Sequence, residues 1–99
     1  MISRQWRALA RREQAQNYIE HLRSETFPAL RRLAGFVGAS ILLRQVQEGT
    51  EFLIVTRWES LASIRQFAGE DPEAAVVPAA VAAMMLDYER RVRHFEVVE

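Results

Sequence analysis

The chain has 99 residues, a formal net charge of zero and no cysteine. Its length allows a single domain over residues 1–99, and the absence of thiols excludes disulfides, thiolate nucleophiles and cysteine-ligated metals. The balanced charge gives no reason to expect binding to nucleic acid or to an anionic membrane.

The first half of the chain predicts a strand, a helical region and a second strand. Residues 2–9 alternate weakly between apolar and polar side chains, as a strand does. Apolar residues then recur at helical spacing, which predicts a helix over residues 11–25. Pro28 can begin a second short helical piece, and Gly35 ends it. Residues 36–47 form a long β-type run.

The next part of the chain predicts a hairpin followed by a capped helix. Glu48-Gly49-Thr50 is a turn signal, so the run over residues 51–59 pairs with the preceding strand as an antiparallel hairpin. Ser60 is a suitable N-cap for the helix that follows, whose apolar positions extend to Ala68.

The last third predicts one more helix and a closing strand. Asp71-Pro72-Glu73 combines an N-cap, a proline at the first helical position and an acid in the first turn. The helix that begins there is expected to continue to Leu86, with a kink or break near Pro78. Residues 88–98 are expected to close the chain as a strand.

No segment predicts a membrane span or a secretory signal. The longest apolar stretch, residues 74–86, is interrupted by Pro78 and is shorter than the about 20 residues that cross a bilayer. The N-terminus has no apolar signal region. All 13 basic residues other than histidine are arginine, which we take as the mark of GC-rich coding. We therefore expect a cytoplasmic, bacterial protein.

The β-α-β-β-α-β order predicts an α+β, ferredoxin-like domain. Right-handed crossovers place both helices on one face of a four-stranded antiparallel sheet. The strands carry apolar residues on both faces, as with Trp58 on one side and Leu53 and Val55 on the other. In the second strand, alternation places Phe36 and Leu42 on the same face. Because the chain has nothing left to cover the second face, we expect two sheets to pack together in a homodimer.

Three segments of the chain resemble a known family. The segment EFLIVTRWESLASIRQFAG, residues 51–69, is similar to the third strand and following helix of the antibiotic biosynthesis monooxygenase family. Gly35-Phe36-Val37-Gly38 resembles the start of that family's second strand, and His94-Phe95-Glu96-Val97-Val98 its last strand. The resemblance implies a dimeric α/β barrel with a cavity in each protomer, between the sheet and the helices.

The resemblance also implies a choice of chemistry. Several members oxidise aromatic polyketides with molecular oxygen and no cofactor, and others degrade haem. The haem-degrading branch carries an aromatic residue on the helix after strand three, here Phe67, and an axial histidine about ten residues later. Val76 and Val77 occupy that position here, so haem degradation is not expected.

Cofactor-free oxygenation needs a base, and donors that stabilise the substrate anion inside an apolar pocket. His94 is the preferred base or anion-binding group, because an imidazole titrates near neutral pH. The alternative is a hydrogen-bonded structural histidine at the dimer interface, which the sequence alone favours. His21 and Glu25 lack a third ligand, so we expect neither a metal nor any other cofactor.

Several large side chains are candidates to line a pocket for a small hydrophobic or aromatic ligand. Each of them also fits an ordinary core position. The candidates are Trp6, Trp58, Phe67, Met84 and Tyr88.

Two functions remain open at this stage. The first is a small homodimeric, cofactor-independent monooxygenase that acts on an aromatic or polyketide-like substrate. The second is a non-catalytic or isomerase-like protein of the same fold that binds a hydrophobic metabolite. A cavity that His94 reaches would favour the first, whereas a His94 sealed in a dimer interface would remove its base.

Overall fold

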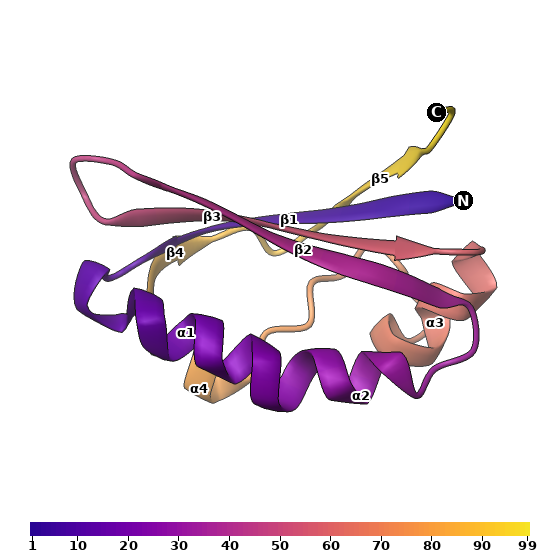
Figure 1. The fold of residues 1–99 in the computed structure, drawn as a ribbon, viewed down its shortest axis with the longest axis horizontal. Coiled ribbons are helices and arrows are strands. Elements are labelled where there is room, and N and C mark those ends of the chain that lie inside the picture. The colour runs from indigo at the N-terminus through magenta and orange to yellow at the C-terminus, as the bar shows by residue number, and fades with distance from the viewer.

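The computed structural model describes residues 1–99 as a twisted antiparallel sheet with all of its helices packed on one face (Figure 1). The strands are β1 (Ile2–Ala10), β2 (Phe36–Gln45), β3 (Thr50–Trp58), β4 (Met85–Tyr88) and β5 (Arg93–Glu96). The helical segments are η1 (Arg12–Gln14), α1 (Ala15–His21), η2 (Leu22–Thr26), α2 (Phe27–Arg31), α3 (Leu61–Ala68) and α4 (Ala79–Ala82). The predicted α+β, ferredoxin-like architecture is confirmed.

The sheet has the order β2-β3-β1, and both β4 and β5 pair with the free edge of β1. β4 pairs with residues 8–10 of β1 and β5 pairs with residues 2–5, so the two short strands share the fourth strand position. The closing strand predicted over residues 88–98 is therefore wrong in its extent. It begins at Met85 and is interrupted at residues 89–92.

The helix predicted from Asp71 to Leu86 is also wrong. Residues 69–78, which we call the strap, are non-helical. The Asp71 carboxylate accepts the Glu73 amide at 3.1 Å and closes a turn there. Farther along, the Ala75 amide donates to the Arg90 carbonyl at 2.9 Å, and the Val92 amide donates to the Glu73 carbonyl at 2.8 Å. This pairing satisfies backbone groups that a helix containing a proline would leave unpaired. Only the short α4 follows the strap.

The long helical region between β1 and β2 contains a π-helical turn at η2. There the Phe27 amide donates to the Leu22 carbonyl, in the position directly before Pro28, which has no amide hydrogen to donate. α2 begins with this proline in its first turn, as predicted. The region brings Tyr18 and Leu30 onto the sheet, where both are buried.

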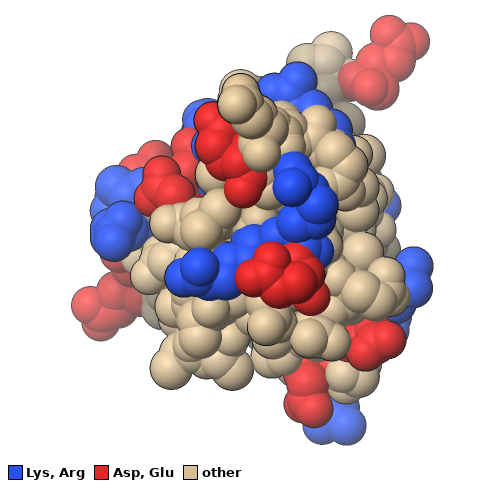
Figure 2. Space-filling view, turned by 90° about the vertical axis from the view of Figure 1, so that its left-hand side faces the viewer, with Lys and Arg blue, Asp and Glu red and all other residues tan.

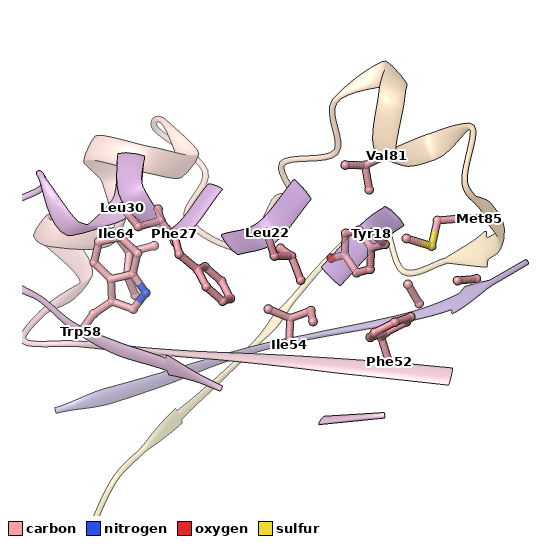
Figure 3. Close-up of a cluster of buried hydrophobic side chains, with 12 residues drawn as sticks. Tyr18, Leu22, Phe27, Leu30, Phe52, Ile54, Trp58, Ile64, Val81 and Met85 are labelled. Atoms are coloured by element: carbon pink, nitrogen blue, oxygen red, sulfur yellow. The ribbon is translucent and has the colours of Figure 1, made fainter. Parts of the chain in front are cut away.

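The core lies between the sheet and the helices (Figure 3). Alternate residues of β3 point towards the helices, and Phe52, Ile54 and Trp58 among them are buried. A bulge between Phe36 and Gly38 shifts the register of β2. Phe36 therefore packs on Trp58, with ring centroids 5.2 Å apart, and the predicted shared face of Phe36 and Leu42 is wrong.

The opposite face of the sheet is uncovered. It presents Leu42 and Phe95, each 50% exposed, together with Glu51, which pairs with Arg7 and Arg44. Basic and acidic side chains are interspersed over the end of the molecule that carries the β2–β3 turn (Figure 2). None of the helices is both long enough and apolar enough to span a membrane.

Candidate functional site

A cavity of about 70 Å³ lies between the sheet and the helices. Ten of its 14 lining residues are hydrophobic, and they come from β1, β3, the long helical region, α3, the strap and the chain after it. Polar atoms in the wall come from Arg4, Tyr18, Thr26 and Thr56. Apolar walls with a few polar groups are the usual composition of a small-molecule site.

Arg4 is the only charged residue in the cavity wall. Its side chain projects from β1 to the helix side of the sheet, and the residue is 5% exposed. The guanidinium donates to the carbonyl of Pro72 and, at 2.8 Å, to the carbonyl of Ala74, both in the strap. Burial lowers the pKa of Arg4 to about 10, so the group stays charged at neutral pH.

The charge of Arg4 has no carboxylate to balance it. The five ion pairs of the chain involve other arginines. The partners of Arg4 are neutral: two carbonyls, an imidazole and the Phe67 ring, whose centroid lies 5.8 Å from its Cζ. Buried charges are normally paired. An unpaired buried cation in the wall of an apolar cavity is therefore a candidate anion-binding group.

His94 contacts Arg4 directly. The two residues are cross-strand partners on β5 and β1, and Nε2 of His94 lies 3.1 Å from Nη1 of Arg4. Because a guanidinium can only donate, Nε2 must accept, which assigns a neutral imidazole with its hydrogen on Nδ1. Burial and, next, the charge of Arg4 lower the pKa of His94, against a smaller raising effect of Glu73.

An outer groove of about 500 Å³ lies on the His94 side of the Arg4–His94 contact. His94 lines this groove together with Pro72, Glu73 and Phe95, whereas Arg4 lines the cavity. As the cross-strand partner of Arg4, His94 lies on the helix side of the sheet, but it is not among the residues that line the cavity.

The aromatic residues singled out from the sequence divide into two groups. Trp6 and Phe67 line the cavity. Trp58 lies behind Phe67, with the two rings stacked at 6.4 Å, and its Nε1–H donates to Thr56 Oγ1 at 2.9 Å. Tyr88 packs against Trp6 at 6.1 Å.

Met84 is outside the cavity wall as well. Its side chain is half-buried against the core, and its carbonyl accepts the Arg11 amide at 2.9 Å. The structure therefore brings two of the five predicted pocket residues to the cavity surface and places the other three around them.

Two cavity residues, Arg4 and Tyr18, are not evident from the sequence as site residues. Arg4 shares the inward face of β1 with Ile2 and Trp6. The sequence signal that could have identified it is therefore an arginine at a position that strand alternation assigns to the buried face. Tyr18 belongs to an apolar helical stripe and looks like a core residue. No group of three or more His, Asp or Glu side chains is placed to hold a metal ion.

The family model described as antibiotic biosynthesis monooxygenase (ABM) matches residues 1–78. The chain belongs to this family. The resemblance noted in the sequence is thus confirmed, and the match covers β1 to the end of the strap. No curated protein sequence matches the chain significantly.

Solved structures share the fold. A candidate antibiotic biosynthesis monooxygenase from Bacillus cereus has a TM-score of 0.67 at 14% identity, over 99% of this chain and 91% of that one. MhuD, a haem degrader from Mycobacterium tuberculosis with two haems in its active site, has a TM-score of 0.60 at 21% identity, over 100% of this chain and 97% of that one. A MhuD variant with two manganese protoporphyrin IX molecules per active site has a TM-score of 0.61 at 22% identity, over 100% of this chain and 96% of that one.

Proposed function

We propose that this protein is a homodimeric, cofactor-independent monooxygenase that binds the deprotonated form of a small aromatic or polyketide-like substrate. The observation that carries the proposal is the buried guanidinium of Arg4, which has no carboxylate partner and faces an apolar cavity. A phenol or enol becomes electron-rich enough to react with dioxygen once it loses its proton. A protein promotes that loss by stabilising the anion.

Arg4 is the group that favours the anion. The hydrogen bonds from Arg4 to the carbonyls of Pro72 and Ala74 join a charge to neutral groups, whereas a substrate oxyanion would add a direct attraction between opposite charges. An oxyanion is therefore a better partner for Arg4. Surrounding apolar walls strengthen this attraction because they exclude water. In the proposed complex the oxyanion replaces the strap carbonyls at the guanidinium.

His94 is the proposed base. In the free protein its Nε2 lone pair accepts from Arg4, which weakens it as a proton acceptor. A substrate hydroxyl that inserts between the two side chains frees Nε2 to take the hydroxyl proton, while Arg4 holds the resulting anion. The lowered pKa of His94 keeps the imidazole neutral, as a base must be.

The aromatic residues would hold the substrate ring. Trp6 and Phe67 form part of the wall, and we propose that Trp58, Tyr88 and Met84 act from behind by fixing the wall's shape. For an anthrone-type substrate, oxidation of the ring methylene to a carbonyl consumes one dioxygen and releases one water. The chain supplies the binding site and the proton acceptor for this reaction.

Size limits what the free protein accepts. An engineered cavity of about 150 Å³ holds one benzene, and the cavity here has about 70 Å³. Even a single ring therefore requires the cavity to widen, and a substrate of two or three rings requires the strap to move outwards. The strap residues Val76 and Pro78 form part of the wall, and the exchange of Arg4 from strap carbonyls to oxyanion would loosen this segment.

Haem, which MhuD binds, does not fit this cavity. The wall contains no histidine, methionine or cysteine to act as an axial ligand. Val76 lines the cavity in the region where the haem-degrading branch carries its histidine. The space available is also much smaller than a porphyrin.

Dimerisation is proposed through the uncovered face of the sheet. Leu42 and Phe95 are exposed there, on a chain whose other sheet face is covered by its own helices (Figure 1). Two such faces packed around a twofold axis would bury these residues.

The test is oxygen uptake by metal-free, flavin-free protein with anthrone-type and hydroquinone-type substrates. Uptake should depend on the protein and fall at least about tenfold in His94→Ala and in Arg4→Gln, since each loses an interaction worth more than about 1.4 kcal/mol in the transition state. Arg31→Gln, which removes an exposed arginine of α2, is the matched control. A folded protein that binds these compounds without consuming oxygen would instead be a binding or isomerase-like member of the family.

A further inference from the structure

Besides Arg4, the cavity wall has three residues with polar side-chain atoms, Tyr18, Thr26 and Thr56, and Tyr18 has no role in the proposed reaction. Tyr18 on α1 is 2% exposed and lines the cavity. Its hydroxyl makes no hydrogen bond within the chain, and burial alone accounts for its raised pKa. No fully buried side-chain nitrogen or oxygen of the chain lacks a hydrogen-bond partner, so this hydroxyl, which has no partner in the chain, keeps accessible surface. The cavity that Tyr18 lines is the space available to it, and buried tyrosine hydroxyls usually find a partner.

The hydroxyl points along the cavity. The Tyr18 ring packs edge-on against Phe52, with centroids 5.0 Å apart. From there its oxygen is directed towards the side of Leu22 and Ile54, away from Met85 (Figure 3). The group is therefore aimed into the space between the sheet and the helices.

Arg4 and Tyr18 lie towards opposite ends of that space. Phe52, beneath Tyr18, pairs with Ala8 of β1, whereas Arg4 pairs with Thr56. These two rows are four residues apart along the strands, about 13 Å at the usual rise per residue. Between them lie the apolar side chains of Trp6 and Ile54, both in the cavity wall.

We propose that Tyr18 is a specificity-determining residue, whose hydroxyl donates a hydrogen bond to a second, neutral oxygen of the substrate, opposite the oxyanion held by Arg4. The substrate class is then an aromatic compound with an ionisable hydroxyl at one end and a carbonyl at the other. This inference rests on the proposed function for the position of the oxyanion.

The two ends of the cavity, at Arg4 and at Tyr18, select different groups of the substrate. Arg4 is a permanent cation at neutral pH and selects negative charge. Tyr18 stays protonated, because burial raises its pKa further above neutral, and a phenol hydroxyl donates to a carbonyl without needing a charge. A site that pairs a substrate oxygen in this way rejects the analogue that lacks it, since its own polar group is then left unpaired.

The experiment compares two single-ring probes in wild type and Tyr18→Phe. 4-Hydroxybenzaldehyde carries the ionisable hydroxyl and the carbonyl at opposite ends, and 4-methylphenol lacks the carbonyl. Dissociation constants are measured by calorimetry, without any oxygenation. Tyr18→Phe should weaken binding of 4-hydroxybenzaldehyde by about tenfold and change that of 4-methylphenol by less than about twofold, since one hydrogen bond is lost only in the first case.

A thermal melt of the unliganded variant gives an independent readout. Tyr18→Phe keeps the ring and removes an unpaired hydroxyl, so its midpoint should equal or exceed that of wild type. A lowered midpoint would mean that the hydroxyl already has a partner in the free protein and would overturn the inference.

The outcomes separate this inference from the proposed function. Equal weakening of both probes, or of neither, would overturn the role of Tyr18 and leave the oxygenase proposal in place. Selective weakening without oxygen uptake would support Tyr18 and remove the oxygenase. If wild type binds neither probe, both proposals fall.

Discussion

At the scale of single residues, the contact between Arg4 and His94 determines the protonation state of the His94 imidazole. Nε2 of His94 accepts from the guanidinium at 3.1 Å, and a protonated imidazole could not do so. Protonation would also place two positive charges side by side in a half-buried location. The geometry and the lowered pKa of His94 therefore agree that the neutral form belongs to the folded state.

This contact predicts a pH dependence of stability. An unfolded chain takes up a proton on His94 near the ordinary pKa of 6.5, whereas the folded chain does so only at lower pH. The unfolded state thus binds more protons in this window, and the free energy of unfolding falls as the pH drops from about 6.5 through the lowered pKa. Above 6.5 the group contributes no pH dependence.

His94→Gln isolates this effect, because glutamine can still accept from Arg4 but does not titrate. Urea denaturation across this pH range should show a smaller loss of stability on acidification in the variant than in wild type. Parallel pH profiles for the two proteins would show that His94 has the same pKa folded and unfolded.

The sequence identified part of the site at this scale. Trp6 and Phe67 were predicted as pocket residues and line the cavity, whereas His94 lines the outer groove and contacts the cavity residue Arg4. Arg4 was missed because its importance comes from lacking a carboxylate nearby, which is a property of three-dimensional packing. Tyr18 was missed because an apolar helical stripe does not reveal whether its hydroxyl finds a partner.

At the scale of elements, the junction between α2 and β2 depends on Gly35. Its φ of +86° is in the left-handed region, and a Cβ added there would lie 1.9 Å from the Ser63 hydroxyl oxygen of α3. The carbonyl of Gly35 accepts the Glu59 amide at 2.8 Å. This glycine therefore fixes how closely the start of β2 approaches the start of α3.

Gly35→Ala and Gly69→Ala form a matched pair. Both positions have a φ above +80°, but a Cβ at Gly69 would meet nothing within 4 Å. Gly69→Ala should cost about 1–3 kcal/mol from backbone strain alone, because its φ of 83° and ψ of −158° form a conformation that essentially only glycine adopts. Gly35→Ala should cost about 1–3 kcal/mol more, from overpacking. Equal losses in urea denaturation would mean that α3 moves aside freely.

The strap explains why one element could not be predicted. Asp71-Pro72-Glu73 has every local feature of a helix start, and the Asp71 carboxylate does accept the Glu73 amide. What decides against the helix is distant in sequence: residues 90–92 and the Arg4 side chain supply partners for the strap backbone. The hairpin and the order of elements were predictable because they depend on neighbours in sequence and on short connections.

At the scale of the whole molecule, one face of the sheet has no element of the same chain packed on it. Leu42→Glu would place a charge within the proposed interface, and an unpaired buried charge costs several kcal/mol. The variant should sediment as a monomer at concentrations where wild type is a dimer.

Leu61→Glu is the control for this experiment. Leu61 is also exposed, at 39%, but lies on α3 on the helix side of the sheet, so this variant should keep the dimer. A monomeric wild type in analytical ultracentrifugation, or equal dissociation of both variants, would contradict the proposed interface.

We propose above all that the positive charge of Arg4 makes the cavity bind an anion. The pKa of a bound phenol is the measurement that tests this most directly. Ultraviolet titration of 4-hydroxybenzaldehyde, free and saturated with protein, gives both values. An apolar cavity alone would raise the phenol pKa, whereas a nearby cation lowers it. We expect a lower phenol pKa in the wild-type complex and loss of that lowering in a folded Arg4→Gln variant. A bound phenol whose pKa is unchanged or raised in wild type would contradict it.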